Sequence, residues 1–241
     1  MTPATKPLNK FLTARWHNLV MANYLVEPEL LGDFLPPGVE LDFWNDKCYA
    51  SLVAFEFLDT RVRGLTVPFH VNFEEVNLRF YVRRETNGEI RRGVVFIKEI
   101  VPRRAIALVA RIFYGEPYET WAMSHQSSDR EISYFWSKNN CANEVKVIVG
   151  QNLGVPTTDS HGEFIIEHYW GYTKRGAART DEYKVEHPKW ELMEVASAQI
   201  NVDFTQIYGQ RFDFLSRAEP KSILLAKGSE ISVYKGAKII L

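Results

Sequence analysis

Cysteine is scarce in this chain of 241 residues. Only Cys48 and Cys141 occur, far apart, and each stands alone in its segment. This excludes a disulfide framework and the paired spacing of a cysteine metal site. Both are therefore expected to be buried, reduced thiols, as in a cytoplasmic protein.

Neither sign of charge dominates, and long hydrophobic runs are absent. The chain has 29 Lys and Arg against 30 Asp and Glu, a formal net charge of −1. Without a basic field, binding to a nucleic acid backbone is disfavoured. No stretch approaches the roughly 18 apolar residues of a membrane span, and the first ten residues lack a signal-peptide core. We expect a cytoplasmic protein that binds neither nucleic acid nor a membrane.

Alternating apolar and polar residues predict about ten strands, against two or three short helices. Their order is not the regular β–α alternation of a parallel sheet. The pattern predicts an α+β fold, predominantly antiparallel, with a sheet curled like a barrel around an interior that could hold a ligand. Residues 1–12 are expected to be a flexible arm and residues 13–241 a single domain.

The strongest local signal is Asn87-Gly88, between strands expected at Val71–Arg84 and Glu89–Val101. Asn-Gly favours a two-residue type I′ turn, because both positions need positive φ. That turn places Arg79 opposite Phe96 and Asn77 opposite Lys98, unless a β-bulge intervenes.

Alternation divides this hairpin into two faces. One face is apolar and holds Val76, Leu78, Phe80, Val82, Val95 and Ile97. The other holds Glu75, Asn77, Arg79, Tyr81, Val94, Phe96 and Lys98. A polar face of this kind either meets water or lines a cavity.

Other segments give coarser predictions. Lys47–Leu58 is apolar on both faces and predicts a central strand. Arg103–Tyr114 predicts a helix with Pro102 at its start and Gly115 at its end. Phe164–Tyr172 fits a helix or a strand, and Gly228-Ser229 predicts a final hairpin.

Glu75, Asn77 and Arg79 are the first candidates for a site. If they face a cavity, Arg79 could hold a carboxylate through two hydrogen bonds. Glu75 could then pair with it or act as a base, with a pKa set by how dry the cavity is. A solvated outer face or a structural Glu–Arg pair are the plainer interpretations.

Lys98, Arg111 and Tyr118 complete the set. A lysine in apolar surroundings loses its charge and becomes a nucleophile, although an exposed, ion-paired Lys98 is the simpler interpretation. Arg111 could hold an anion or satisfy the carbonyls at its helix C-terminus. Tyr118 could donate a hydrogen bond to a ligand or pack as an ordinary buried tyrosine.

No cofactor or metal site is expected. His161, Glu163, Glu167 and His168 have neither the HExxH spacing nor a facial triad. Ser124, His125 and Ser127 lack the glycines of a nucleophile elbow.

Several segments occur in a characteristic order: FEEVNLRFYV at 73–82, GVVF at 93–96, GEPY at 115–118, RTDEY at 179–183 and HPKW at 187–190. This ordered set resembles the YqjF-like family, an uncharacterised bacterial family grouped with the acetoacetate decarboxylase-like superfamily. The resemblance covers about residues 15–235. It implies a cone-like antiparallel barrel around a buried cavity, with a family glutamate matching Glu75.

The resemblance departs from true acetoacetate decarboxylases at one position. Their corresponding segment ends in Gly-x-Pro-Lys, and the lysine forms a Schiff base with a β-keto acid. Here the similar segment is Gly115-Glu116-Pro117-Tyr118. A phenol cannot condense with a ketone, so the resemblance implies the cavity without its catalytic amine.

Two functions remain open. The chain could bind a small, anionic ligand through Asn77, Arg79, Arg111 and Tyr118, or it could be an enzyme that acts on a keto acid or carboxylate through Lys98 or Glu75. A third interpretation is a scaffold filled by its own aromatic side chains. Antiparallel sheets with free edges often pair between chains, which leaves a homo-oligomer open.

Overall fold

The computed structural model describes residues 10–103 and 115–240. The expected helix at Arg103–Tyr114, including Arg111, lies outside this part of the chain except for Arg103. Strand β1 begins at Lys10, inside the segment expected to be an arm. In the part described, no helix has the length and apolar character needed to cross a membrane.

In residues 10–103 and 115–240, fifteen strands form one sheet, and most of them are antiparallel. They are β1 (Lys10–Leu25), β2 (Glu40–Leu41), β3 (Tyr49–Val62), β4 (Leu65–Thr66), β5 (Phe73–Thr86), β6 (Glu89–Val101), β7 (Tyr118–Thr120), β8 (Ala122–Ser127), β9 (Glu131–Lys138), β10 (Cys141–Gly154), β11 (Trp170–Lys174), β12 (Arg179–Glu186), β13 (Leu192–Asn201), β14 (Ser222–Tyr234) and β15 (Ala237–Ile240). The helical elements are η1 (Pro28–Leu31), α2 (His161–Ile166), α3 (Phe204–Tyr208) and η2 (Gln210–Ser216). The expected α+β, predominantly antiparallel fold is confirmed.

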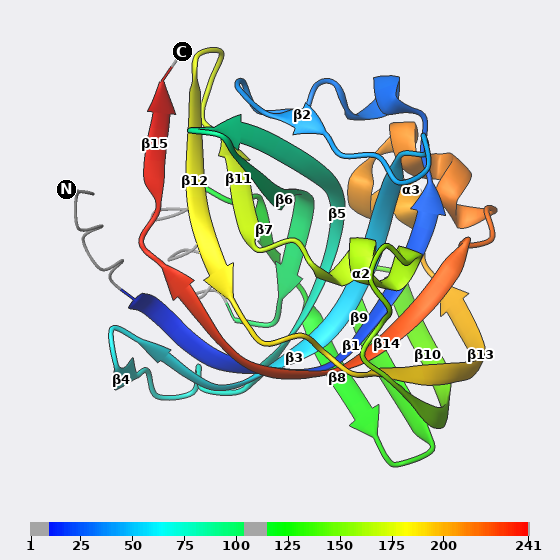
Figure 1. The fold of residues 1–241 in the computed structure, drawn as a ribbon. Helices are drawn as coiled ribbons and strands as arrows, with labels where there is room; N and C mark the ends of the chain where they lie inside the picture. Colours follow the sequence, from blue (N-terminus) through cyan, green and yellow to red (C-terminus); the bar gives the residue numbers. More distant parts are fainter. Residues whose placement is uncertain (1–9, 104–114, 241) are drawn as a thin grey trace.

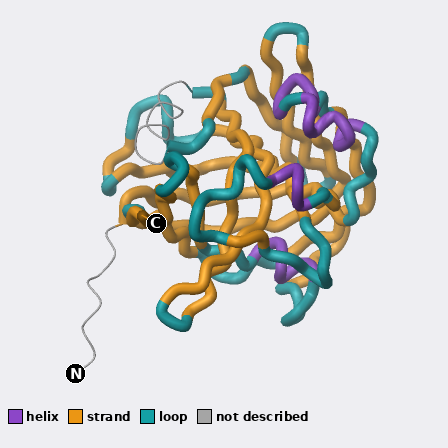
Figure 2. The backbone as a smooth tube through the Cα atoms, turned by 90° about the horizontal axis from the view of Figure 1, so that it is seen from above, coloured by secondary structure: helices purple, strands orange, loops and turns teal. Residues whose placement is uncertain are grey.

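Seven strands close into a ring, in the order β12-β11-β6-β5-β3-β1-β14 (Figure 1). The ring closes because β12 also pairs with β14, through Val185 opposite Val233 and Glu186 opposite Ser232. From β14 the sheet continues beyond the ring through β13, β10 and β9 to β8 (Figures 1 and 2). Strands β9 and β10 share a hydrophobic core with the outer face of the ring.

The ring has apolar side chains on both of its faces. Leu52, Val76 and Leu78 point outward into a core shared with β9, β10, α3 and η2. Phe55, Phe73 and Val94 point inward. Strand β3 lies between β1 and β5 and is buried on both sides, which explains its continuous apolar sequence.

The hairpin of β5 and β6 turns at Asn87-Gly88, where φ is +51° and +75°. Arg79 lies opposite Phe96, as expected. The register then shifts: Leu78 pairs with Lys98, so that Ile97 is an extra residue in β6. The expected pairing of Asn77 with Lys98 is therefore wrong, because this β-bulge moves every residue of β6 beyond it by one position.

The structure also decides two other segments, Gly228-Ser229 and residues 164–172. The expected hairpin at Gly228-Ser229 is wrong, because β14 runs through both residues. Gly228 has φ +79° and lies against the carbonyl of Trp16, where a Cβ would come within 2.1 Å. The glycine thus permits a close approach of two strands. Segment 164–172 contains the end of α2, a short connection and the start of β11.

Candidate functional site

The ring surrounds a cavity of about 190 Å³ that is partly open to solvent. For comparison, an engineered cavity of roughly 150 Å³ in another protein holds benzene. The wall is mostly apolar and includes Trp16, Leu19, Phe55, Phe57, Phe73, Val94, Phe96, Ile166, Trp170 and Trp190. The polar or titratable residues of the wall are Thr60, His70, Glu75, Asn77, Arg79, Glu99, Glu116, Tyr118, His168, Tyr183 and His187.

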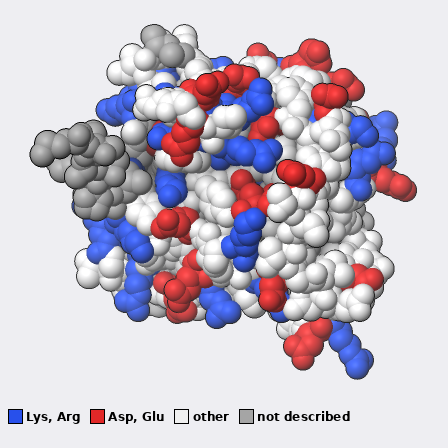
Figure 3. Space-filling model, in the orientation of Figure 1, with Lys and Arg blue, Asp and Glu red and all other residues white. Residues whose placement is uncertain are grey.

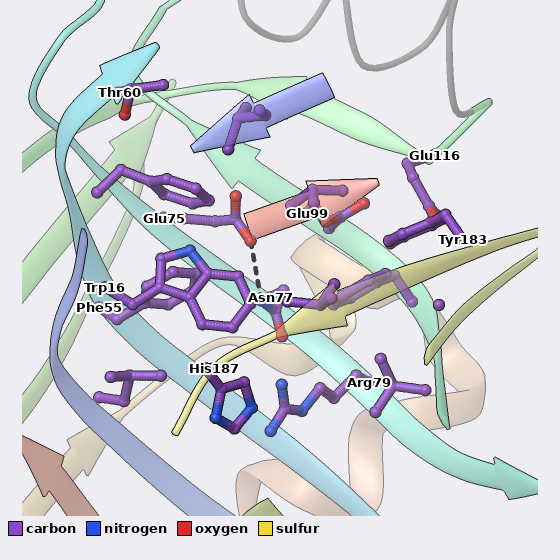
Figure 4. Close-up of a pocket in the computed structure, with 18 of the residues that line it drawn as sticks. Trp16, Phe55, Thr60, Glu75, Asn77, Arg79, Glu99, Glu116, Tyr183 and His187 are labelled. Carbon is purple, nitrogen blue, oxygen red and sulfur yellow. Dashed lines mark hydrogen bonds between the residues drawn. The ribbon is translucent and has the colours of Figure 1, made fainter. Parts of the chain in front are cut away.

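Strand β5 supplies the central polar row. Glu75, Asn77 and Arg79 are spaced by two, so all three point to the inner side of the ring (Figure 4). Their relative exposures are 3%, 1% and 9%. Asn77 Nδ2 donates to Glu75 Oε1 at 3.0 Å. The three residues thus form one enclosed polar row in an apolar wall.

Among the residues described, Arg79 is a buried cation that no acidic side chain pairs with. Its Nη2 contacts Met21 Sδ at 3.8 Å, and its Nε has no hydrogen-bond partner in residues 10–103 and 115–240. No ion pair joins it to an acid there, and segments 1–9 and 104–114 contain no acidic side chain. A buried charge without a partner is costly, which makes Arg79 the most unusual polar group of the cavity wall.

Two histidines lie close enough to Arg79 to feel its charge. Burial lowers the pKa of His168 to about 4, against a hydrogen bond with Asp42 that raises it. Burial also lowers the pKa of His187 to about 4, and the charge of Arg79 adds to this shift. The ring of His187 lies beside the guanidinium of Arg79 (Figure 4). Both histidines are therefore neutral at pH 7 and add no second positive charge beside Arg79.

Three buried carboxyl groups lie farther along the cavity. Burial raises the pKa of Glu75 to about 7, opposed by hydrogen bonds from Asn77 and Tyr118 and by the charge of Arg79. Burial raises the pKa of Glu116 to about 8, opposed by hydrogen bonds from Thr173 and Tyr183. These two carboxyls therefore hold protons near neutral pH, and the cavity is less negative than its residue count suggests.

Glu99 is the third carboxyl, and the sequence analysis did not identify it as a site residue. Burial, together with the charges of Glu116 and Glu75, raises the pKa of Glu99 well above its usual range. The bulge at Ile97 turns Glu99 into the cavity in the position that unbroken alternation assigns to Lys98. No feature of the sequence marked the bulge.

Lys98 is not among the residues that line the cavity. Its Nζ lies 2.7 Å from Glu119 Oε1 and donates to the backbone carbonyl of Ile207 in α3. No lysine occurs in the cavity wall formed by the described part of the chain. Lys98 therefore holds β6 to neighbouring elements outside the ring.

Tyr118 lines the cavity from β7 and reaches Glu75. Its hydroxyl donates to Glu75 Oε2 at 3.0 Å. The segment before it is fixed by backbone pairing, because Glu99 N donates to Pro117 O at 3.2 Å. Arg111 lies outside the described residues. The structure thus brings four of the six expected site residues together: Glu75, Asn77, Arg79 and Tyr118.

The surface differs in character from the cavity. On the face shown in Figure 3, Lys and Arg alternate with Asp and Glu, in keeping with the net charge of −1.

His161 packs between Trp44 and Tyr49, whereas His168 bonds to Asp42 Oδ2 at 3.1 Å. The two histidines that drew attention in the sequence therefore have separate surroundings.

Comparison with known proteins places these observations in a family. Residues 13–230 match the family DUF2071, described as "Uncharacterized conserved protein". "Uncharacterized protein YqjF" of Bacillus subtilis (strain 168) is 27% identical over 194 residues, which cover 78% of this chain and 77% of that protein.

Solved structures show the same fold at low sequence identity. The enduracididine biosynthesis enzyme MppR, complexed with pyruvate, superposes with a TM-score of 0.69 and 15% identity over 98% of this chain and 93% of MppR. Acetoacetate decarboxylase from Legionella pneumophila subsp. pneumophila str. Philadelphia 1 gives a TM-score of 0.65 and 12% identity over 99% of this chain and 92% of that enzyme. The chain has the acetoacetate decarboxylase-like fold and belongs to the DUF2071 family.

Proposed function

We propose that the ring cavity binds a small molecule through a carboxylate that pairs with Arg79. The observation that carries this proposal is the buried guanidinium group without an acidic partner. A carboxylate can accept two parallel hydrogen bonds from a guanidinium group, and a dry site strengthens this pairing. Neutral His168 and His187 do not compete for the anion.

The protonation states of Glu75 and Glu116 support the same class of ligand. When Glu75 and Glu116 carry their protons, Arg79 is not surrounded by fixed negative charge, and an anion can enter. As the pH rises past about 7 and 8, these carboxyls ionise. Binding of the anion should weaken over the same interval, because like charges repel strongly in a low dielectric.

The test compares two arginines of the same strand. Arg79 points into the cavity, whereas Arg83 lies nearer the end of the strand, outside the cavity wall, and its exposed side chain pairs with Glu40 at 3.3 Å. We would titrate the wild type, Arg79→Met and Arg83→Met by calorimetry with pyruvate, butyrate and benzoate, and with butyramide as the uncharged control.

The expected result is carboxylate binding by the wild type and by Arg83→Met, with at least a hundredfold loss in Arg79→Met. Butyramide should not bind measurably. Equal binding of the acids by Arg79→Met would refute the proposal, and so would the absence of any carboxylate binding by the wild type.

We also infer that Tyr118 occupies the position of the Schiff-base lysine in acetoacetate decarboxylases. The support is the similarity of Gly115-Glu116-Pro117-Tyr118 to Gly-x-Pro-Lys, together with the place of Tyr118 in the cavity wall. In Tyr118→Lys, borohydride should trap pyruvate as a covalent adduct on the new lysine. No adduct on that residue, in a variant that still binds pyruvate, would contradict the correspondence.

A second candidate function is proton transfer by Glu75. A carboxyl with a pKa of about 7 is suited to act as both acid and base at neutral pH. Its carboxylate would remove a proton from the carbon next to a ketone, the electron pair would move to the ketone oxygen as an enolate, and the proton would return to carbon. The fixed charge of Arg79 would favour the enolate.

Deuterium exchange separates binding from this chemistry. With pyruvate in heavy water, the wild type should exchange the methyl protons faster than buffer does, and Glu75→Gln should lose this rate while it still binds pyruvate. Exchange at the buffer rate in the wild type rejects the second candidate and leaves the binding proposal in place. We assign no role to Lys98 in either function, because it does not line the cavity.

A further inference from the structure

The cavity is elongated along β5. Arg79 lies at one end and Phe73, six residues away, lies toward the other, which corresponds to ~20 Å at about 3.3 Å per residue. In Figure 4, Thr60 and Arg79 lie at opposite ends of the view, with Glu75 and Asn77 between them. A three-carbon acid bound at Arg79 would leave most of this length unfilled.

The two ends differ in exposure. At the Arg79 end, the lining residues Ile166, His168, His187 and Trp190 are all buried. At the Phe73 end, the wall includes Val67, which is 43% exposed. Among the residues described, the Phe73 end therefore meets solvent, and the charged end is enclosed.

A continuous row of aromatic rings joins the two ends. Trp190 stacks on His187 with 3.9 Å between the ring centroids, and the ring centroids of Trp16 and Trp190 are 6.0 Å apart. Trp16 and Phe57 pack edge to face with 5.8 Å between their ring centroids, and Phe57 stacks on Phe73 with 4.7 Å between theirs. Glu75 and Asn77 bond to each other on the opposite, β5 side. The row gives a hydrocarbon chain an apolar path from Arg79 to the opening.

The loop at the open end continues this apolar path. Leu65 is 73% exposed and Phe69 is 86% exposed, on either side of Val67. Single exposed apolar residues are common. Three within five residues at the mouth of an apolar cavity form a patch of the kind that marks a binding surface.

We propose that the natural ligand is an amphipathic monocarboxylate with an unbranched hydrocarbon tail of about eight to ten carbons. Its carboxylate pairs with Arg79, its tail follows the aromatic row, and its end lies against Val67 and the loop of Leu65 and Phe69. The inference rests on the proposed carboxylate site and adds the class of ligand. An extended chain advances about 3.8 Å over three bonds, so a tail of this length spans roughly 10–13 Å of the ~20 Å between Arg79 and Phe73. The carboxylate–guanidinium pair, with ~2.8 Å between nitrogen and oxygen, and the van der Waals radius of the terminal methyl group take up most of the remainder.

The experiment measures affinity as a function of tail length. Wild-type protein is titrated by calorimetry with butyrate, hexanoate, octanoate and decanoate at concentrations below micelle formation. Each buried methylene should raise the affinity by about fourfold, so octanoate should bind at least a hundredfold more tightly than butyrate.

Variants at the mouth localise the effect. Val67→Ser should lower the affinity for decanoate by about fivefold, because it removes apolar surface from the tail's path, and should leave butyrate within twofold. Ile90→Ser is the matched control, because Ile90 is also an exposed apolar residue, at 60%, but does not line the cavity. It should change neither affinity.

The outcomes separate this inference from the proposed function. Equal affinities for butyrate and decanoate, both lost in Arg79→Met, would reject the proposed hydrocarbon tail of the ligand and retain the carboxylate site. Chain-length dependence that Val67→Ser does not alter would overturn the assigned path. Failure of all four acids to bind would reject both proposals.

Discussion

Tyr118 donates its phenolic hydrogen to Glu75 Oε2, with 3.0 Å between the two oxygens, inside a closed ring of strands. This bond joins the short strand β7 to the middle of β5. It also opposes the rise in the pKa of Glu75 that burial causes. Tyr118, which we propose to occupy the position of the Schiff-base lysine, thus lowers the pKa of a buried carboxyl group.

The stability of the fold should fall as the pH rises from 6.5 to 8. The pKa values of Glu75, Glu116 and Glu99 are higher in the folded chain than the ordinary value of 4.5. The folded state therefore keeps protons that the unfolded state has released, and stability is lost as the pH rises through this interval. The lowered pKa values of His168 and His187 act in the opposite direction, but only from about 4 up to 6.5.

Urea denaturation at pH 6.5 and 8.0 measures this loss, expected on the order of 2 kcal/mol. Glu116→Gln should reduce the difference, because one of the titrating groups is gone. Glu40→Gln, at an exposed carboxylate, should leave it unchanged. A free energy of unfolding that stays constant or rises between the two pH values would show that these carboxyls are ionised in the folded chain.

Arg79→Met should be at least as stable as the wild type in the absence of ligand. The substitution removes a buried charge without an acidic partner and keeps an apolar side chain next to Met21 and Tyr81. Replacing buried charges with apolar groups is often neutral or stabilising. The measurement is the free energy of unfolding in urea. A loss of more than about 2 kcal/mol would indicate that Arg79 holds the fold together.

Lys98→Met should leave ligand binding unchanged and cost about 1 kcal/mol of stability. The side chain pairs with Glu119 and the carbonyl of Ile207, and it does not line the cavity. Calorimetry with butyrate and urea denaturation provide the two readouts. Weaker butyrate binding by a folded Lys98→Met protein would place Lys98 at the site after all.

Gly93→Ala should destabilise the ring by about 2–3 kcal/mol. Gly93 lies where β6 pairs with β11, and a Cβ there would come within 2.5 Å of the backbone oxygen of Trp170. Gly32→Ala is the control, because its Cβ would lie 3.6 Å from the backbone oxygen of Glu29, an ordinary contact, and its φ is −54°. Thermal unfolding should show a large drop only for Gly93→Ala, and equal midpoints would mean that β6 and β11 are less tightly joined than described.

Much of the hairpin could be predicted from local sequence. Asn87-Gly88 specified the turn, and the period of two placed Val76 and Leu78 on one face and Glu75 and Asn77 on the other. The prediction held from the turn to Arg79. It ended at Ile97, because a bulge depends on how β6 meets its neighbours and leaves no mark in the alternation of apolar residues.

The composition of the site was less accessible from sequence. Glu99 lay in a segment without a recognisable motif, and Glu116 lay at the variable position of the segment similar to Gly-x-Pro-Lys. Both enter the cavity only because β6 and the segment before β7 come together. The aromatic wall was equally hidden. Trp16 and Trp190 are 174 positions apart in the chain and meet because β1, β14 and the connection before β13 converge.

By itself, the sequence determined the strand-rich class, the Asn-Gly turn, the apolar character of both faces of β3 and the unlike faces of β5, because each depends on neighbours a few positions away. Tertiary structure alone decided that β12 meets β14 to close the ring, that the polar face of β5 borders enclosed space, and that Glu99 rather than Lys98 enters it. Those outcomes depend on pairings between distant segments, and side-chain alternation carries no record of them.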